Sequence, residues 1–219
     1  MPTSTVEDYL KCIYLEQEAV PGKDVSTGQI AAALQVAPGT ATSMVKTLAE
    51  TGLVEYAPYS GVQLTPAGRK LATHVLRRHR LVELFLVRIM GMNWSEVHGE
   101  AEVLEHVISE RLLDRMDEML GHPATDPHGD PIPTAGGEIA NPDYANLLEC
   151  DLDRELVLAR VTDQRQDFLR LLERHGLMPG NRLTVSARDE LSETVNVRPL
   201  GGDPLQLGYH AASRVLVEN

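Results

Sequence analysis

The chain has 219 residues, which is enough for one large domain or for two to three small ones. Its net charge of −12 argues against a surface coated with nucleic-acid contacts, and no apolar stretch approaches the ~18 residues that a membrane-spanning helix needs. The polar start MPTSTVEDY lacks the basic and apolar regions of a signal peptide, so we expect a cytoplasmic protein in which Cys12 and Cys150 are free thiols.

The charge is divided unevenly along the chain. Residues 1–80 carry eight basic and seven acidic side chains, whereas residues 81–219 carry twelve basic and twenty-five acidic ones. Between Ala41 and Arg80 there are six basic residues and two acidic ones. Only this first part of the chain has the local positive excess that contacts with DNA phosphates require.

The first elements form a helix-turn-helix pattern. Thr5 is placed to cap a helix over residues 6–18, whose apolar positions repeat at helical spacing. Ser26 and Gln29 form a capping box for a short helix over residues 27–34. After a turn, Pro38 stands where a first helical residue tolerates proline, and that helix ends before Gly52.

The helix that begins at Pro38 has two faces. Its apolar residues are Ala41, Met44, Val45 and Leu48. The opposite side chains are small or basic, which lets a helix approach DNA bases and phosphates closely. Residues 53–64 then alternate as two short strands, so the unit predicts a winged helix-turn-helix rather than a generic helical domain. The candidate DNA contacts are Pro38, Gly39, Thr40, Thr42, Ser43, Lys46, Tyr59 and Ser60.

Two long helices are predicted next. Thr65-Pro66 opens one that runs to about Met90, and a capping box of Asn93 and Glu96 opens another from Trp94 to about Leu120. The second helix carries an apolar stripe suited to core packing or to a partner subunit. It also carries metal-ligand types at offsets of 0, 4, 7 and 8, within a ~100° arc; they are His98, Glu102, Glu105 and His106. The first of these two helices carries two more residues of metal-binding type, His79 and Glu83, four residues apart.

The remaining chain changes character. Residues 121–146 are rich in Pro and Gly, which predicts an irregular tether in which His122 and His128 face solvent. Beyond it, short alternating segments and one helix over residues 163–176 predict a small barrel of strands. Asp163, Gln164 and Asp167 supply hard oxygen donors at the start of that helix, or simply cap it.

Several of these motifs occur together in a known family. The segments EDYLKCIYLE, RRHRLVELFL, VHGEAEVLEHVIS and HGDPIP follow one another in this order. With them the whole chain resembles the DtxR/MntR family of metal-dependent transcriptional regulators. The resemblance implies a mainly α fold with a small β part: a winged helix-turn-helix over 1–73, a helical metal-binding and dimerisation domain over 74–142, and an SH3-like domain of the FeoA type over 143–219.

The resemblance also implies two metal sites. The primary site would use, with the backbone carbonyl of Glu102, the side chains of Asp8, Glu102, Glu105 and His106. An ancillary site would use His79, Glu83 and His98, completed from the SH3-like domain by Gln164 and Asp167, with Asp163 as another candidate. Family members are homodimers that bind palindromic DNA operators.

Two positions distinguish the metals. Iron-responsive members have Met and Cys where this chain has Asp8 and Glu102. Soft sulfur ligands suit Fe(II), whereas carboxylates and imidazoles suit the harder Mn(II). Short manganese-responsive members carry a carboxylate where Lys11 stands here, and a charged lysine cannot be a ligand. The sequence therefore predicts a manganese site without a closely spaced two-metal cluster of that kind.

The expected function is a manganese-dependent repressor of metal-uptake genes, with no enzymatic activity and no small organic substrate. One alternative is an Fe(II)-dependent regulator of the same fold. Another is a helical metal-binding enzyme or storage protein, because Glu-x-x-His pairs on facing helices also build di-iron bundles. That alternative needs a second such pair on a facing helix and leaves the winged unit unexplained.

Overall fold

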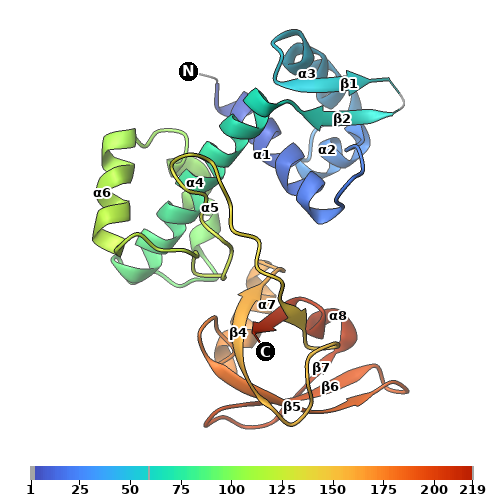
Figure 1. Cartoon of the computed structure of the whole chain (residues 1–219), viewed down its shortest axis with the longest axis vertical. Coiled ribbons are helices and arrows are strands. Elements are labelled where there is room, and N and C mark those ends of the chain that lie inside the picture. The colour runs from blue at the N-terminus through green and yellow to red at the C-terminus, as the bar shows by residue number, and fades with distance from the viewer. Residues whose placement is uncertain (1–2, 59, 219) are drawn as a thin grey trace. The chain divides into compact units, whose positions relative to one another are not determined.

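The computed structural model describes residues 3–58 and 60–218 (Figure 1). The chain forms two compact units, which we describe separately. The first unit consists of the residues up to His79 together with Leu104–Ile108 and Pro133–Glu138. The second consists of Arg80–Val103, Ser109–Ile132 and the residues from Ile139 onward. Among the described residues, no helix has both the length and the apolar character needed to cross a membrane.

The first unit contains the predicted winged helix-turn-helix. Its elements are α1 (Ser4–Ala19), α2 (Thr27–Ala33), α3 (Pro38–Glu50), β1 (Val54–Ala57) and β2 (Gly61–Leu64). The capping box of Ser26 and Gln29 is present, and Pro38 is the first residue of α3. The predicted cap of α1 was wrong, because Thr3 rather than Thr5 accepts the hydrogen bond from the backbone of Val6.

Three helices follow: α4 (Pro66–Arg88), α5 (Val97–Leu104) and α6 (Glu110–Leu120). The single helix predicted from Trp94 to Leu120 was therefore wrong. Asn93 accepts from the backbone of Ser95, and no capping box starts a helix at Trp94. The chain leaves the helical path after Leu104, and Ser109 caps a new helix by accepting from Leu112 at 3.3 Å. The apolar spacing continues through this break, so periodicity alone could not reveal it.

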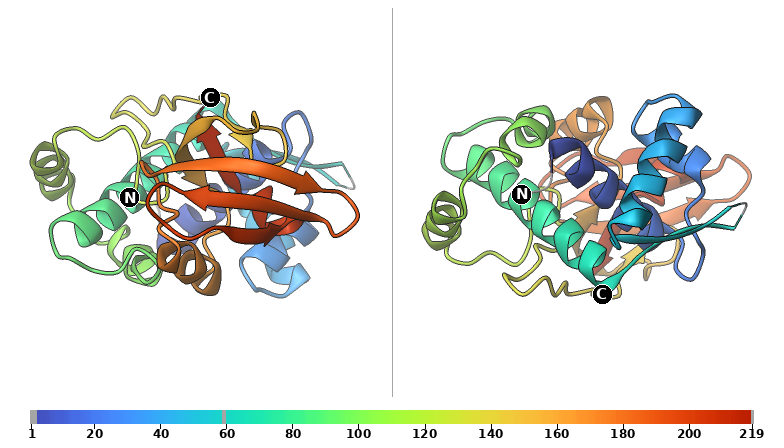
Figure 2. Two further views of the ribbon diagram at one scale, coloured as in Figure 1. Left: turned by 90° about the horizontal axis from the view of Figure 1, so that it is seen from below. Right: turned by 90° about the horizontal axis from the view of Figure 1, so that it is seen from above.

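The second unit ends in a curved six-stranded sheet with strand order β3-β8-β4-β5-β6-β7, whose strands are visible in Figure 2. The strands are β3 (Ala145–Asn146), β4 (Glu155–Val161), β5 (Arg182–Asp189), β6 (Thr194–Pro199), β7 (Leu205–Gly208) and β8 (Val215–Glu218). The helices α7 (Gln166–Arg174) and α8 (Tyr209–Ala212) accompany it. Alternate residues of the strands are buried in its core, as the predicted small barrel requires.

Residues 121–132 are irregular, but they are not a tether. His128 is completely buried, so the prediction that it faces solvent was wrong. Its carbonyl accepts from the backbone of Val161 at 2.8 Å, which fixes the segment against β4. Gly129 has φ +86°, and a Cβ there would lie 2.0 Å from the carbonyl oxygen of Ala159. His122 is exposed as predicted and pairs with Asp117 at 2.9 Å.

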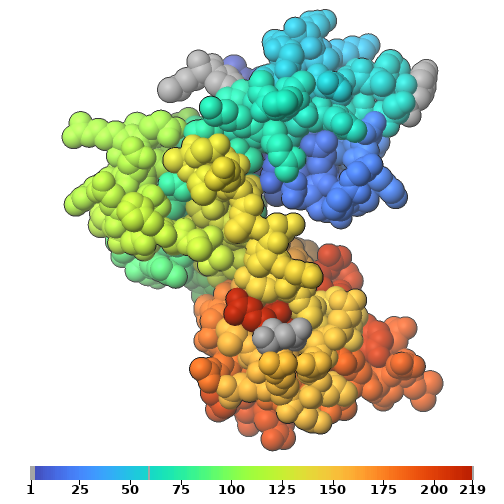
Figure 3. Space-filling view, in the orientation of Figure 1, coloured from blue at the N-terminus to red at the C-terminus, as the bar shows by residue number. Residues whose placement is uncertain are grey.

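The helix α6 keeps a largely exposed surface, which appears in yellow-green in the space-filling view (Figure 3). Leu112 and Met119 are each about half exposed on it, whereas Leu113 is buried. The predicted stripe therefore lies outside the buried core: Leu112 is half exposed, and its other members are only partly buried, namely Leu104, Ile108, Met116 and Leu120.

Candidate metal centre

Three predicted ligands meet in the first unit. Asp8 comes from α1, and Glu105 and His106 come from the turn that follows α5. His106 Nε2 lies 2.9 Å from Asp8 Oδ1 and 3.5 Å from Glu105 Oε1. One ligand atom from each residue lies within 4.8 Å of the others, which is the spacing of donors that can share one cation. The helix α5 ends at Leu104. Glu105 and His106 therefore lie in a turn, and their side chains can both point toward α1.

Glu7 orients the imidazole of His106. Its carboxylate Oε2 lies 2.7 Å from His106 Nδ1, and its Oε1 accepts from Arg78 at 2.8 Å. When Nδ1 donates to this carboxylate, Nε2 keeps its lone pair toward Asp8 and Glu105. Glu7 was not among the residues predicted for this site. The sequence feature that could have identified Glu7 is its spacing: it stands three residues before Leu10 and seven before Tyr14, and so lies on the buried face of α1.

Glu105 is a completely buried carboxylate with a contact on each oxygen. Oε1 accepts from Lys11 Nζ at 2.6 Å, and Oε2 lies 2.5 Å from His79 Nδ1. A buried carboxylate beside the carboxylate of Asp8 needs positive charge nearby, and the ammonium of Lys11 supplies part of it. The donor set of two carboxylates and an imidazole fits a divalent cation that prefers oxygen and nitrogen ligands.

Glu102 lies on α5 and belongs to the second unit. Its side chain is 39% exposed, and its Oε1 lies 3.6 Å from His98 Nε2, one helical turn earlier. The group that contains Asp8, Glu105 and His106 does not include it. Its assignment to the primary site remains a prediction from the family resemblance.

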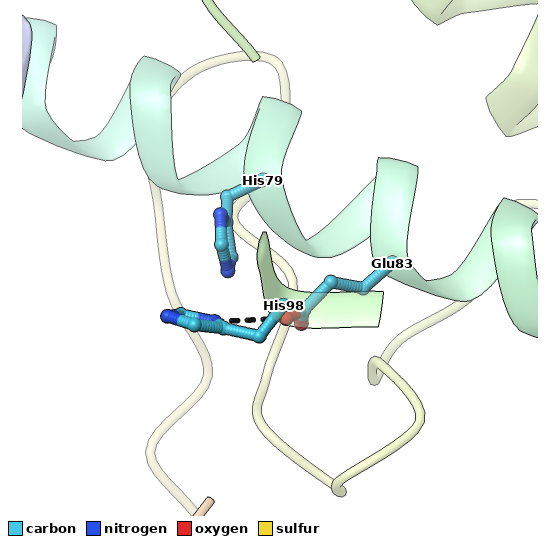
Figure 4. Close-up of side chains that lie close together, drawn as sticks. All are labelled: His79, Glu83 and His98. Carbon is cyan, nitrogen blue, oxygen red and sulfur yellow. Dashed lines mark hydrogen bonds and ion pairs between the residues drawn. The ribbon is translucent and has the colours of Figure 1, made fainter. Parts of the chain in front are cut away.

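The predicted ancillary ligands His79, Glu83 and His98 are drawn in Figure 4. His79 and Glu83 project from successive turns of α4, and His98 comes from α5. Glu83 is completely buried, and its Oε1 lies 3.2 Å from His98 Nδ1. His98 itself is half exposed, so this pair joins a buried carboxylate to an imidazole at the surface.

A second cluster, which the sequence did not predict, involves the other carboxylate oxygen of Glu83. His128 Nδ1 is 3.6 Å from Glu83 Oε2, while Nε2 is 3.0 Å from the carbonyl oxygen of Trp94. Ligand atoms of Glu83, Asp126 and His128 lie within 4.8 Å of one another, and all three residues are buried. The Pro- and Gly-rich composition around Asp126 and His128 predicts a tether, so it gives no sign of this cluster.

The buried charges of this cluster perturb one another. Burial, with a smaller effect from the carboxylates of Asp130 and Glu83, raises the pKa of Asp126 to about 7. For His128, burial lowers the pKa, but the close carboxylate of Glu83 and that of Asp126 outweigh it and leave the pKa above its usual value. The cluster therefore holds a proton or a cation more readily than isolated carboxylates would.

The residues predicted from the SH3-like domain have other contacts. Gln164 Nε2 donates to Asp130 Oδ2 at 2.7 Å, and Asp163 pairs with Arg165, which lowers the pKa of that carboxyl. Asp167 lines a shallow depression with Asn93, Arg170, Glu173 and Arg174. Within the described part of the chain, Asp167 joins no close group of three metal-binding side chains. The assignments of Gln164 and Asp167 as metal ligands remain predictions.

The candidate DNA contacts lie on α3 and the hairpin. Pro38, Gly39, Thr40, Ser43, Lys46 and Ser60 are exposed. Thr42 is half-buried, and its hydroxyl donates to the carbonyl of Pro38 at 2.9 Å, so it is less available than predicted. Tyr59 lies outside the described residues.

A winged helix-turn-helix joined to carboxylate and histidine clusters defines a DNA-binding protein that responds to a metal. Family models match in the same order along the chain: the iron dependent repressor N-terminal DNA binding domain over residues 1–62, its metal binding and dimerisation domain over 65–134, and the FeoA domain over 145–219. The chain belongs to the DtxR/MntR family of metal-dependent transcriptional repressors.

Individual relatives are similar to this chain over nearly its full length. The chain is 34% identical over 230 residues to the iron-dependent repressor IdeR of Mycobacterium leprae, covering 98% of this chain and 96% of that protein. It is similar to a solved manganese-dependent transcriptional repressor in complex with manganese, with a TM-score of 0.87, 41% identity and coverage of 97% and 98%. It is also similar to ScaR with bound Cd²⁺, with a TM-score of 0.81, 35% identity and full coverage of both chains.

Proposed function

We propose that this protein is a manganese-dependent repressor that acts in the cytoplasm as a homodimer on a palindromic operator of metal-uptake genes. Residues 1–73 would bind DNA, residues 74–142 would hold metal and pair with a second copy, and residues 143–219 would form the SH3-like domain. The observation that carries the proposal is the meeting of Asp8, Glu105 and His106 within 4.8 Å.

The choice of Mn²⁺ rests on donor chemistry. Asp8 and Glu102 stand where sulfur ligands would favour iron, and oxygen donors suit the harder manganese ion. The similarity to a solved manganese-dependent repressor supports the same choice. The alternative metal is Fe²⁺, which the name of the IdeR relative supports.

The proposed response couples the metal site to the position of α1. The carboxylates of Asp8 and Glu105 repel each other when no divalent cation lies between them, which favours a loosened first helix. A bound divalent cation supplies the charge that removes this repulsion. Asp8 then holds α1 against the turn at Glu105 and His106, and Glu7 keeps the imidazole of His106 oriented. In a dimer this fixes the spacing of two recognition helices on DNA.

The test is a gel-shift titration of operator DNA against protein with Mn²⁺, and with Fe²⁺ under anaerobic conditions. We expect Asp8→Ala to lower the Mn²⁺-dependent affinity at least a hundredfold, and Glu102→Cys to shift the preference toward Fe²⁺. Asp203→Ala removes an exposed carboxylate and is the matched control. Unchanged binding by Asp8→Ala would overturn the proposal.

A further inference from the structure

One buried charge at the metal site is not accounted for by metal binding. Lys11 follows Asp8 by three residues on α1, so both side chains lie on the same side of the helix. The Lys11 side chain is only 9% exposed, and its Nζ lies 2.6 Å from Oε1 of Glu105, which is itself completely buried. Lysine is rarely buried to this extent unless it is paired.

This group contains two close ion pairs and the further carboxylate of Asp8. Arg78 contacts Glu7 at 2.8 Å, and Lys11 contacts Glu105 at 2.6 Å. With neutral histidines, the three carboxylates and two cations of these five side chains sum to one net negative charge. Without Lys11 the same group would carry two, which would match the charge of a divalent cation.

The position of the ammonium also matters. Nζ lies at hydrogen-bond distance from Glu105 Oε1, the same oxygen that lies 3.5 Å from His106 Nε2. A cation shared by Asp8, Glu105 and His106 would be close to this ammonium, and like charges at such distances repel in a buried site. The long flexible stem of lysine allows the ammonium to withdraw.

We propose that Lys11 is a tethered cation that competes with the metal for Glu105. In the metal-free protein it neutralises Glu105 and so offsets only part of the repulsion between Glu105 and Asp8. When metal binds, the ammonium must give up Oε1, so Lys11 lowers the metal affinity and sets the concentration at which the regulator responds. The inference rests on the proposed function, because it assumes that metal binds beside Glu105.

The test is calorimetric titration of the full chain with MnCl₂, without DNA. Lys11→Met keeps the length of the side chain and removes its charge, and we expect it to bind Mn²⁺ at least tenfold more tightly than the wild type. Metal-free Lys11→Met should melt at a lower temperature, because Glu105 loses its counter-charge. With saturating Mn²⁺ it should melt at or above the wild-type temperature.

Two controls separate charge from packing. Lys11→Arg keeps a cation and should bind Mn²⁺ within about threefold of the wild type. Lys70→Met removes an exposed lysine from α4 and should change neither quantity. If Lys11→Met does not fold without metal, Lys11→Gln is titrated instead, because the amide can still donate to Glu105 while it removes the charge.

The results distinguish this inference from the proposed function. If Asp8→Ala leaves the wild-type titration unchanged, Mn²⁺ does not bind here and the proposed function fails. If Asp8→Ala removes one Mn²⁺ binding event but folded Lys11→Met and Lys11→Gln bind Mn²⁺ there no more tightly than the wild type, only the inference is overturned. A purely structural lysine would weaken metal binding when removed, not strengthen it.

Discussion

Replacement of Glu7 by glutamine tests whether this residue orients the metal-binding histidine. Glu7 is buried between Arg78 Nη2 at 2.8 Å and His106 Nδ1 at 2.7 Å. Glutamine has one acceptor oxygen, so it can serve only one of these two groups. Loss of one buried charged hydrogen bond costs about 2 kcal/mol of folding stability. Loss of the hydrogen-bond partner of a metal ligand lowers metal affinity by roughly 10–100-fold.

The chain offers a matched control for this substitution. Glu18 also lies on α1 and pairs with an arginine of α4, Arg69, at 2.7 Å, but both side chains are about half exposed. Exposed pairs of this kind contribute about 0–1 kcal/mol. Chemical denaturation and Mn²⁺ titration of Glu7→Gln and Glu18→Gln measure both quantities. Equal effects of the two substitutions, or unchanged Mn²⁺ affinity in Glu7→Gln, would refute the orienting role.

Two further predictions concern packing and buried charge. A Cβ at Gly68 would lie 1.9 Å from the carbonyl oxygen of Leu53, so Gly68→Ala should lose about 1–3 kcal/mol of stability. Gly28→Ala on α2 meets no contact closer than 3.8 Å and should lose nothing in the same denaturation assay. Burial and two neighbouring carboxylates raise the pKa of Asp126 to about 7 from its ordinary 3.8. The folded state therefore holds this proton more tightly than the unfolded state does. The stability that the bound proton contributes is lost as the pH rises from about 4 to 7. Metal-free Asp126→Asn should be more stable than the wild type at pH 8, with a smaller difference at pH 5; a difference that grows toward pH 5 would contradict this.

Local signals predicted local structure well. The capping box of Ser26 and Gln29 and the proline at the start of α3 involve residues within one helical turn of each other, so neighbours along the chain suffice to define them. The alternation that predicted β1, β2 and the C-terminal strands is equally local.

Predictions failed where distant residues decide. The apolar spacing of residues 94–120 is helical throughout, but the cap at Ser109 and the contacts of Glu105 with Lys11 and His79 favour the break. The Pro- and Gly-rich composition around His128 indicated solvent exposure. Its hydrogen bond to Trp94 and its contact with Glu83 bury it instead.

The sequence by itself determined the DNA-binding unit, the family and the donor chemistry, because residue type decides which atoms can bind a cation. Only the tertiary structure decided which donors meet. Lys11 and Glu105 are 94 residues apart, and their pairing depends on how α1 packs against the turn after α5. Periodicity describes one helix at a time, whereas burial and charge compensation are properties of elements brought together. The roles of Glu7 and Lys11 at this centre therefore emerge only from the folded chain.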